Sequence, residues 1–296
     1  MKLMGLFLLS LIIGCSHFQA SAQESKDCQI KMYDGRDLIE KADFESLFQD
    51  VQPGEVIVMG EIHDNLCHHA NHLNALKILQ SLYPNQRVHV AMEFISFEHQ
   101  EVLDAYLNKE ISEEEFLVGV DWRGDFSPYR DKILFPSLNG GRAFGINSPR
   151  ELSGAIARGG IDSLSDEQKR LLPPNFERGR EIYFERFIEV MTHDSGHDLP
   201  REFLENYFWA QSLWDDTMAY TTLRWSEKYS EDIMVIIVGD FHVAYGGGLP
   251  DRLLQRGAQN IRSISQVHSD SFSEQDQIDP SGPYGHRADF IIQSVD

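Results

Sequence analysis

The sequence is poor in positive charge. Its 296 residues include 26 Lys and Arg against 47 Asp and Glu, a formal net charge of −21 at pH 7. Because binding to a phosphate backbone needs a basic face, this balance argues against nucleic acid as a partner. It remains compatible with a basic partner or a metal-loaded ligand.

The chain also lacks a hydrophobic run long enough to span a bilayer. The apolar run from Leu3 to Ile13 follows a single cation, Lys2, and has the shape of an export signal. Ile12–Cys15 resembles a bacterial lipobox, whose cysteine is lipidated after cleavage, whereas Ala20–Ala22 is a small-residue site of the ordinary secretory kind. The lipobox is favoured because Cys15 follows the apolar run without a gap. We therefore expect a lipoprotein signal peptide at 1–14, a tether at 15–27 and a single α/β domain at 28–296.

Cysteine is scarce, with three in the whole chain. If Cys15 carries lipid, Cys28 and Cys67 remain. In an oxidising compartment these two can pair, but the sequence alone does not show that their Cα atoms are close enough. The alternative is that Cys67 is a metal ligand.

Several familiar motifs are absent. The sequence has no repeat of 20–50 residues, which argues against a solenoid or propeller. It contains no CxxCH haem-attachment motif, no Walker loop, no GxGxxG and no GxSxG elbow. Any cofactor or catalytic site must therefore be sought outside these patterns.

What the sequence does contain is a series of short apolar runs separated by helical patterns. Near-continuous apolar runs suit parallel strands buried on both faces, and their alternation with helices predicts an α/β fold with a mostly parallel sheet flanked by helices. A long interval between the third and fourth core strands, about 148–230, predicts a helical insertion or small lobe. The predicted strands are 56–60, 88–94, 143–147, 234–239, 261–265 and 290–293, and the predicted helices are 66–82, 149–158, 165–172, 178–192 and 200–228.

Two of the predicted strands end in the same spacing, Gly-x-x-His. These motifs end at His63 and His242, and two carboxylates, Glu61 and Glu93, also follow strands. In open α/β sheets ligands bind at the carboxyl ends of parallel strands. Two imidazoles and two carboxylates suit a divalent transition metal, or general acid–base work without one. The alternative is that these are polar residues capping helices at strand–loop junctions.

A second histidine cluster follows on the predicted helix 66–82. There His68, His69 and His72 fall within an arc of about 100°. This arc is either a solvated helix face or a set of groups that holds a metal or flanks a haem. His89, inside a strand, is predicted to be a satisfied core or sheet-face histidine, and "HDSGHD" at 193–198 an ordinary polar loop.

Two tyrosines, Tyr129 and Tyr245, lie in segments that are candidates for site loops. A tyrosinate can ligate ferric haem iron, and histidine can ligate the iron or hydrogen-bond to the phenolate. The glycines at 246–248 precede a predicted helix N-terminus, which is able to hold an anion such as a haem propionate.

Six segments occur in an order that resembles the ChaN-like haem-binding uptake lipoproteins of the Tiki/TraB superfamily. They are "VMGEIHDNLCHH", "VAMEF", "DWRGDFSPYRDKILF", "INSPRE", "FWAQSLWDDTMA" and "VGDFHVAYGGGLPDRL", and the resemblance covers roughly residues 30–260. It implies an α/β core with a helical lobe, and haem held by tyrosine and histidine between two chains of a dimer. The candidate haem-binding residues are then Tyr129, Tyr245, His242, His63 and His68.

The resemblance also implies two alternative functions. The first is a haem- or iron-binding cell-envelope lipoprotein that serves iron acquisition with envelope transport components, anchored at the outer membrane and facing the periplasm, or secreted into the periplasm. The second is a divalent-metal-dependent, peptidase-like hydrolase, as in relatives that use the paired motifs. Its metal-binding and catalytic residues would be Glu61, His63, Glu93 and His242, with Arg150 and Asp215 orienting them.

Overall fold

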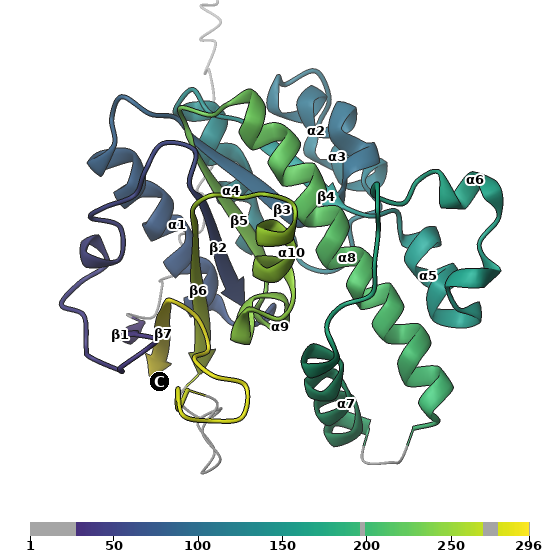
Figure 1. Ribbon diagram of the computed structural model, residues 1–296. Coiled ribbons are helices and arrows are strands. Elements are labelled where there is room, and N and C mark those ends of the chain that lie inside the picture. Colours follow the sequence, from purple (N-terminus) through teal and green to yellow (C-terminus); the bar gives the residue numbers. More distant parts are fainter. Residues whose placement is uncertain (1–27, 196–198, 269–277, 296) are drawn as a thin grey trace, which may run out of the picture.

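A computed structural model describes residues 28–195, 199–268 and 278–295 (Figure 1). Seven strands form one sheet in the order β1-β7-β6-β2-β5-β3-β4. The predicted signal peptide, its Cys15 and the predicted tether lie outside the described residues. No helix of the described part of the chain combines the length and apolar character needed to cross a membrane.

The sheet is parallel at every pairing except that of β1 with β7. This confirms the predicted fold class, and every predicted strand is present, with ends within three residues of the prediction. β1 is an addition, at the edge of the sheet beside the C-terminal strand. The strands are β1 (Gln29–Asp34), β2 (Val56–Glu61), β3 (Val88–Ser96), β4 (Ala143–Asn147), β5 (Ile233–Gly239), β6 (Ile261–His268) and β7 (Phe290–Val295).

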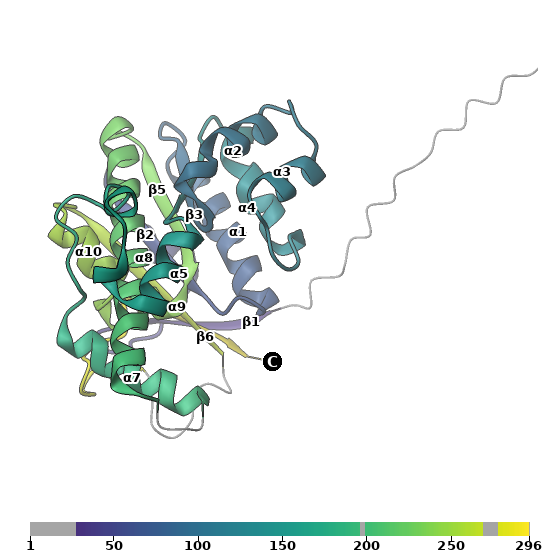
Figure 2. The ribbon, with the colours of Figure 1, turned by 90° about the vertical axis from the view of Figure 1, so that its right-hand side faces the viewer.

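Two layers of helices cover the sheet (Figure 2). Because side chains alternate along a strand, Ile57 and Met59 of β2 pack into the core beneath one layer, and Val56 and Val58 pack beneath the other. The first layer is α1 (Leu66–Leu82), α2 (Gln100–Leu107), α3 (Glu113–Gly119) and α4 (Ser127–Leu138). The second contains α5 (Arg150–Gly159), α8 (Arg201–Lys228) and α10 (Leu249–Gln255). The alternation decides which layer each residue at a strand end faces.

The predicted helical insertion is present between β4 and β5. It consists of α5, α6 (Asp166–Lys169), α7 (Glu181–Ser195) and the long α8, which crosses the sheet and extends beyond it beside α7 (Figure 1). Helix α7 continues through Ser195, so the predicted loop at 193–198 begins as helix, and residues 196–198 lie outside the described part. Helices α2, α3 and α4 are additions to the predicted ones.

The remaining elements are short. Helix α9 (Asp240–Val243) begins directly after β5, so the second Gly-x-x-His motif turns from strand to helix within one residue. Single 3₁₀ turns lie at Glu45–Leu47, Phe97–His99, Ile161–Ser163 and Ala244–Gly246.

Candidate functional site

A cleft of about 480 Å³ opens where the carboxyl ends of β3 and β4 meet the loop after β2. His63 and Glu93 lie in it together with the aromatic side chains of Phe94, Trp122, Tyr129 and Trp214. Arg123 and Arg150 also line it, and both guanidinium groups donate to the Asp121 carboxylate. The cleft thus combines aromatic walls, the imidazoles of His63 and His99, four carboxylates and two cations.

The two Gly-x-x-His motifs meet at Gly239. A Cβ at that position would lie 2.9 Å from Cε1 and 3.2 Å from Nε2 of His63, and 3.6 Å from Oε2 of Glu93. Oε2 of Glu93 also accepts a hydrogen bond of 2.6 Å from the Gly239 N–H. The His63 side chain is 57% exposed, so its imidazole is the accessible histidine of the pair of motifs.

His242 lies behind the cleft, between two carboxylates. Its Nδ1 is 2.6 Å from Oδ1 of Asp215 on α8, and its Nε2 is 3.4 Å from Oε1 of Glu93. Burial alone would lower the pKa of His242, but Asp215 and Glu93 raise it to about 10. Asp215 and Glu93 therefore favour the protonated form of this ring in the absence of a metal.

Glu61 lies on the other side of the sheet from this pair. As the sixth residue of β2 it shares a face with Ile57 and Met59, so it points toward α1 and α4, while Glu93 shares a face with Ala91, which packs in the core beneath α8. The four predicted metal ligands are therefore divided by strand alternation. His63 is the one that contacts Glu61, with Nδ1 3.2 Å from Oε1.

The buried Glu61 carboxylate is surrounded by donors and imidazoles. Tyr129 donates a hydrogen bond of 2.6 Å to Oε1, and Lys132 donates one of 3.5 Å to Oε2. Nδ1 of His69 and Nδ1 of His72 lie 3.3 and 3.2 Å from Oε2. Burial raises the pKa of Glu61, but its contacts with the three imidazoles outweigh burial and hold the pKa far below its usual range.

The alternative of a solvated face for the α1 histidines is wrong. His68 and His72 are fully buried and His69 is 5% exposed. His69 Nε2 is bonded to the carbonyl of His63 at 2.9 Å, and His72 Nε2 lies 3.1 Å from the carbonyl of Gly60. The helical pattern did not predict this burial, because histidine was counted as a polar residue that faces solvent. In the structure, this face of α1 covers the buried Glu61 carboxylate.

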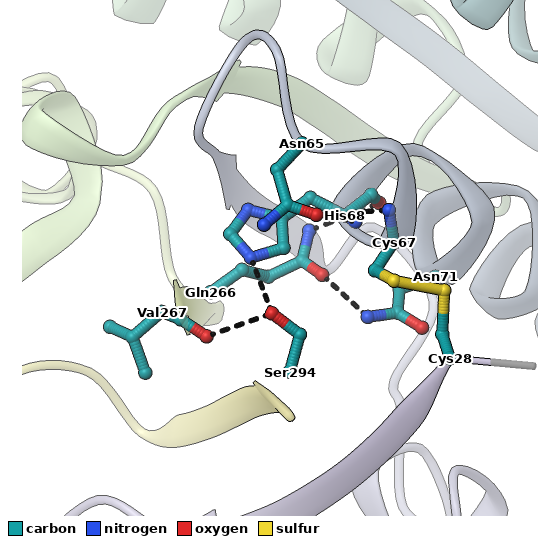
Figure 3. The surroundings of a disulfide bond; sticks show 8 residues. All are labelled: Cys28, Asn65, Cys67, His68, Asn71, Gln266, Val267 and Ser294. Atoms are coloured by element: carbon teal, nitrogen blue, oxygen red, sulfur yellow. Dashed lines mark hydrogen bonds between the residues drawn. A yellow bond between two sulfur atoms is a disulfide. The ribbon is translucent and has the colours of Figure 1, made fainter. Parts of the chain in front are cut away.

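Cys28 and Cys67 form a disulfide, with Cα atoms 5.6 Å apart (Figure 3). The bond joins the start of β1 to the first turn of α1 and removes Cys67 from the candidate ligands. His68 lies beside it, accepting a hydrogen bond from the Ile62 N–H and contacting Ser294 (Figure 3). His68 is thus committed to internal contacts away from the cleft lining.

Neither predicted tyrosine presents a free phenolate to the cleft. Burial, followed by the nearby Glu61 carboxylate, raises the pKa of Tyr129 well above its usual value. Tyr245 lies against the guanidinium groups of Arg186 and Arg287, and lines a different, small hollow.

Lys132 and the tryptophans of the cleft are the residues that the sequence patterns did not single out. Lys132 projects from α4 and is only 1% exposed. A lysine three residues after Tyr129 in an otherwise apolar helix face was the available signal, since lysine is almost never fully buried without a partner. Burial lowers its pKa to about 8, against the opposing attraction of Glu61.

A family model described as haem-binding uptake, Tiki superfamily, ChaN matches residues 47–253. The chain belongs to this family. No protein with a curated description matches the sequence.

A solved structure supports the fold. A structure of ChaN from Campylobacter jejuni with cofacial haem binding has a TM-score of 0.69 at 15% identity, and the match covers 91% of this chain and 98% of that one. An erythromycin esterase mutant, EreC, in its open conformation gives a TM-score of 0.47 at 13% identity, covering 86% of this chain and 80% of that one. The first likeness shows the fold, and the second is too weak to carry an argument.

Proposed function

We propose that this protein binds haem in the cleft at the carboxyl edge of the sheet, with the His63 imidazole facing the iron. The observation that carries the proposal is the exposed imidazole of His63 inside an aromatic cleft of a chain that belongs to the haem-binding uptake family. The volume of the cleft, about 480 Å³, lies within the range of small-molecule and cofactor sites.

The donor set of the cleft fits haem. Phe94, Trp122 and Trp214 offer apolar faces to a porphyrin, and Arg123 and Arg150 offer cations to its propionates. Histidine is a common axial ligand of haem iron. A tyrosinate ligand is disfavoured at position 129, because the Tyr129 hydroxyl donates to Glu61 and its pKa is raised. When bound, haem would supply an iron centre whose ligation these residues set.

The test is a haem titration of the purified protein, followed by the Soret band. The wild type should give a saturable spectrum, and His63→Ala and Trp122→Ala should each weaken binding at least about tenfold, the equivalent of 1.4 kcal/mol. Tyr245→Phe is the matched control and should leave the spectrum unchanged. Absence of saturable binding in the wild type would reject the proposal, and a ligand spectrum lost in Tyr129→Phe but kept in His63→Ala would reject His63.

Placement in the cell is a further part of the proposal. A haem-binding protein exported with a lipid on Cys15 would serve iron acquisition at the outer membrane and pass haem or iron to envelope transport components. Supporting it are the lipobox-like sequence and the pairing of Cys28 with Cys67, which suits an oxidising compartment. Metabolic labelling with a fatty acid should mark the wild type and not Cys15→Ala.

A haem-dependent dimer should appear as a doubling of mass in light scattering.

A divalent-metal hydrolase is the second candidate, and one arrangement supports it. His63 and Glu93 converge on Gly239, and Asp215 holds the ring of His242 so that Nε2 faces Glu93. A carboxylate behind a histidine is a common way to orient a metal ligand. Metal-stimulated cleavage of a peptide library that is lost in Glu93→Gln would favour this function, and no cleavage with any divalent metal would remove it.

A further inference from the structure

We propose that Glu61, His69 and His72 form a second, buried cation site beneath the cleft, in which the Lys132 ammonium and a divalent transition metal compete for the same acceptors. The site shares only Glu61 with the set predicted at the strand ends, and takes its two imidazoles from the histidine cluster of α1. It does not depend on haem binding in the cleft.

The three acceptor atoms already have the spacing of metal ligands. Nδ1 of His69 and Nδ1 of His72 lie 3.3 and 3.2 Å from Oε2 of Glu61. Ligands about 2.0–2.1 Å from a tetrahedral Zn²⁺ are about 3.3–3.4 Å from one another. The three atoms lie within 4.8 Å of one another. A small movement of the two imidazoles toward each other would therefore bring the remaining pair, Nδ1 of His69 and Nδ1 of His72, to the same ligand–ligand distance.

In both imidazoles, the ring nitrogen that faces away from Glu61 contacts a backbone carbonyl. His69 Nε2 bonds to the carbonyl of His63, and His72 Nε2 lies within hydrogen-bond distance of the carbonyl of Gly60. The Gln266 amide nitrogen also lies 2.8 Å from His72 Nε2, which without a metal favours the proton of His72 on Nδ1, facing Glu61. Metal binding takes the other tautomer, in which the Nδ1 atoms of His69 and His72 are both acceptors directed at Glu61. A backbone carbonyl behind the ring is a usual way to fix the tautomer of a metal-ligating histidine.

One nitrogen of the set is left without a hydrogen bond. Among the described residues, Nδ1 of the fully buried His72 has no hydrogen-bond partner, although Oε2 of Glu61 is 3.2 Å away. A buried ring nitrogen without a hydrogen bond is costly, so such a group calls for an explanation. A cation between His69, His72 and Glu61 would satisfy it.

Lys132 supplies a cation at one side of this set. Its Nζ is 2.6 Å from Nδ1 of His69 and 3.5 Å from Oε2 of Glu61. The ammonium also lies 4.4 Å from the centre of the Tyr129 ring. Lys132 therefore contacts two of the three acceptors that a metal would use and repels a divalent cation from the site.

Access to the site runs past the cleft. His63 and Tyr129 both line the cleft, and both contact Oε1 of Glu61. The buried Glu61 carboxylate is thus one side chain removed from the cleft. Imidazole and carboxylate ligands together suit Zn²⁺, Co²⁺ or Fe²⁺.

The test is a Co²⁺ titration of the full chain after chelator treatment, followed by the visible absorption of bound Co²⁺. Lys132→Met keeps the length of the side chain and removes the charge. It should bind one Co²⁺ about 100-fold more tightly than the wild type, because a nearby positive charge is lost. Adding His72→Gln to Lys132→Met should abolish this site, whereas adding Glu93→Gln, which alters only the cleft, should leave it intact.

Unchanged Co²⁺ affinity in Lys132→Met would overturn the proposal, as would binding that survives His72→Gln or disappears in Glu93→Gln. Thermal melting with and without Zn²⁺ shows whether Lys132→Met is folded. The wild type gives an independent measurement if it is not: weak Co²⁺ binding should be lost in His72→Gln and kept in Glu93→Gln. Haem binding by the wild type is read separately from its Soret band, so failure of either proposal leaves the other testable.

Discussion

Gly60 and Asp240 lie in direct contact across β2 and β5, so that a Cβ at position 60 would be 2.2 Å from Oδ1 and 3.0 Å from Cα of Asp240. The contact is reciprocated at Gly239, against which His63 packs. Each Gly-x-x-His motif thus needs its glycine because a side chain of the other motif occupies the space. The two motifs form one interlocked unit.

Gly60→Ala should destabilise the fold. Its Cβ would meet the Asp240 carboxylate, which is fixed by hydrogen bonds from Ser265 and Gln266, and the Asp240 backbone. We expect a loss of about 3 kcal/mol in the free energy of unfolding, measured with denaturant. Gly154→Ala in α5 is the control, because there the nearest atom is the flexible end of Arg158. A loss no larger than that of the control would contradict the interlock.

Gly239→Ala should act on the cleft more than on stability. The atoms in its way belong to His63, whose exposed side chain can move aside. We expect a fall of about tenfold in haem affinity with a loss of stability of about 1 kcal/mol. Haem titration and denaturant unfolding of the same preparation measure the two effects. A variant that unfolds as readily as Gly60→Ala would show that His63 is not free to shift.

Removing the disulfide should weaken the whole domain. Cys28 and Cys67 are 39 residues apart in the sequence, and closing a loop of that length stabilises a fold by about 4 kcal/mol in the chain-entropy estimate. The Cys28→Ser/Cys67→Ser variant should lose a similar amount in denaturant unfolding. Reductant should destabilise the wild type and leave the variant unaffected. Equal stability of the oxidised wild type and the variant would refute this expectation.

Asp215→Asn should lower the pKa of His242. The wild-type value of about 10 reflects two carboxylates that outweigh the effect of burial, and the substitution removes one of them. NMR titration of the His242 ring should then show its protonation moving toward the neutral range. Asp216→Asn is a matched control, because Asp216 pairs with Arg256 instead. No movement of the His242 titration would exclude Asp215 as its main partner.

Burial of neutral His89 should make the free energy of unfolding depend on pH. This histidine is 1% exposed, its Nε2 bonds to Asp232, and its Nδ1 accepts from the Arg142 N–H, so the ring is neutral. Burial lowers its pKa below the usual 6.5, and a folded-state pKa that is depressed stabilises the fold above the unfolded pKa. This contribution should be lost as pH falls below about 6.5. Unfolding in His89→Gln should show a weaker dependence over that range, and an identical dependence would contradict the assignment.

The sequence predicted the sheet well because its strands are buried on both faces. β5, with seven buried residues in succession, cannot be mistaken for an alternating amphipathic element. β1 was missed because it is an edge strand with mixed burial, paired to the C-terminal strand. The position of β1 depends on a partner more than 250 residues away in the chain, which local patterns do not contain.

The sequence named most residues of the candidate site but did not predict how they are arranged. The pairing of His63 with Glu93 around Gly239 follows from the strand ends, which the sequence located. The separation of Glu61 from Glu93 follows from alternation along β2 and β3, and depends on which helical layer covers each face. The burial of His69 and His72 depends on how α1 packs against the sheet and against α4, a helix that was not predicted.

β1 is antiparallel to the other strands, so its first residue lies at the carboxyl edge of the sheet, where the cleft opens. The disulfide from Cys28 fixes that point beside the first turn of α1, directly after the loop that carries His63. The tether proposed above would then join the domain at the edge of the sheet on which the cleft opens. The crosslink thus fixes the start of β1 to α1 at the edge of the sheet where the cleft opens.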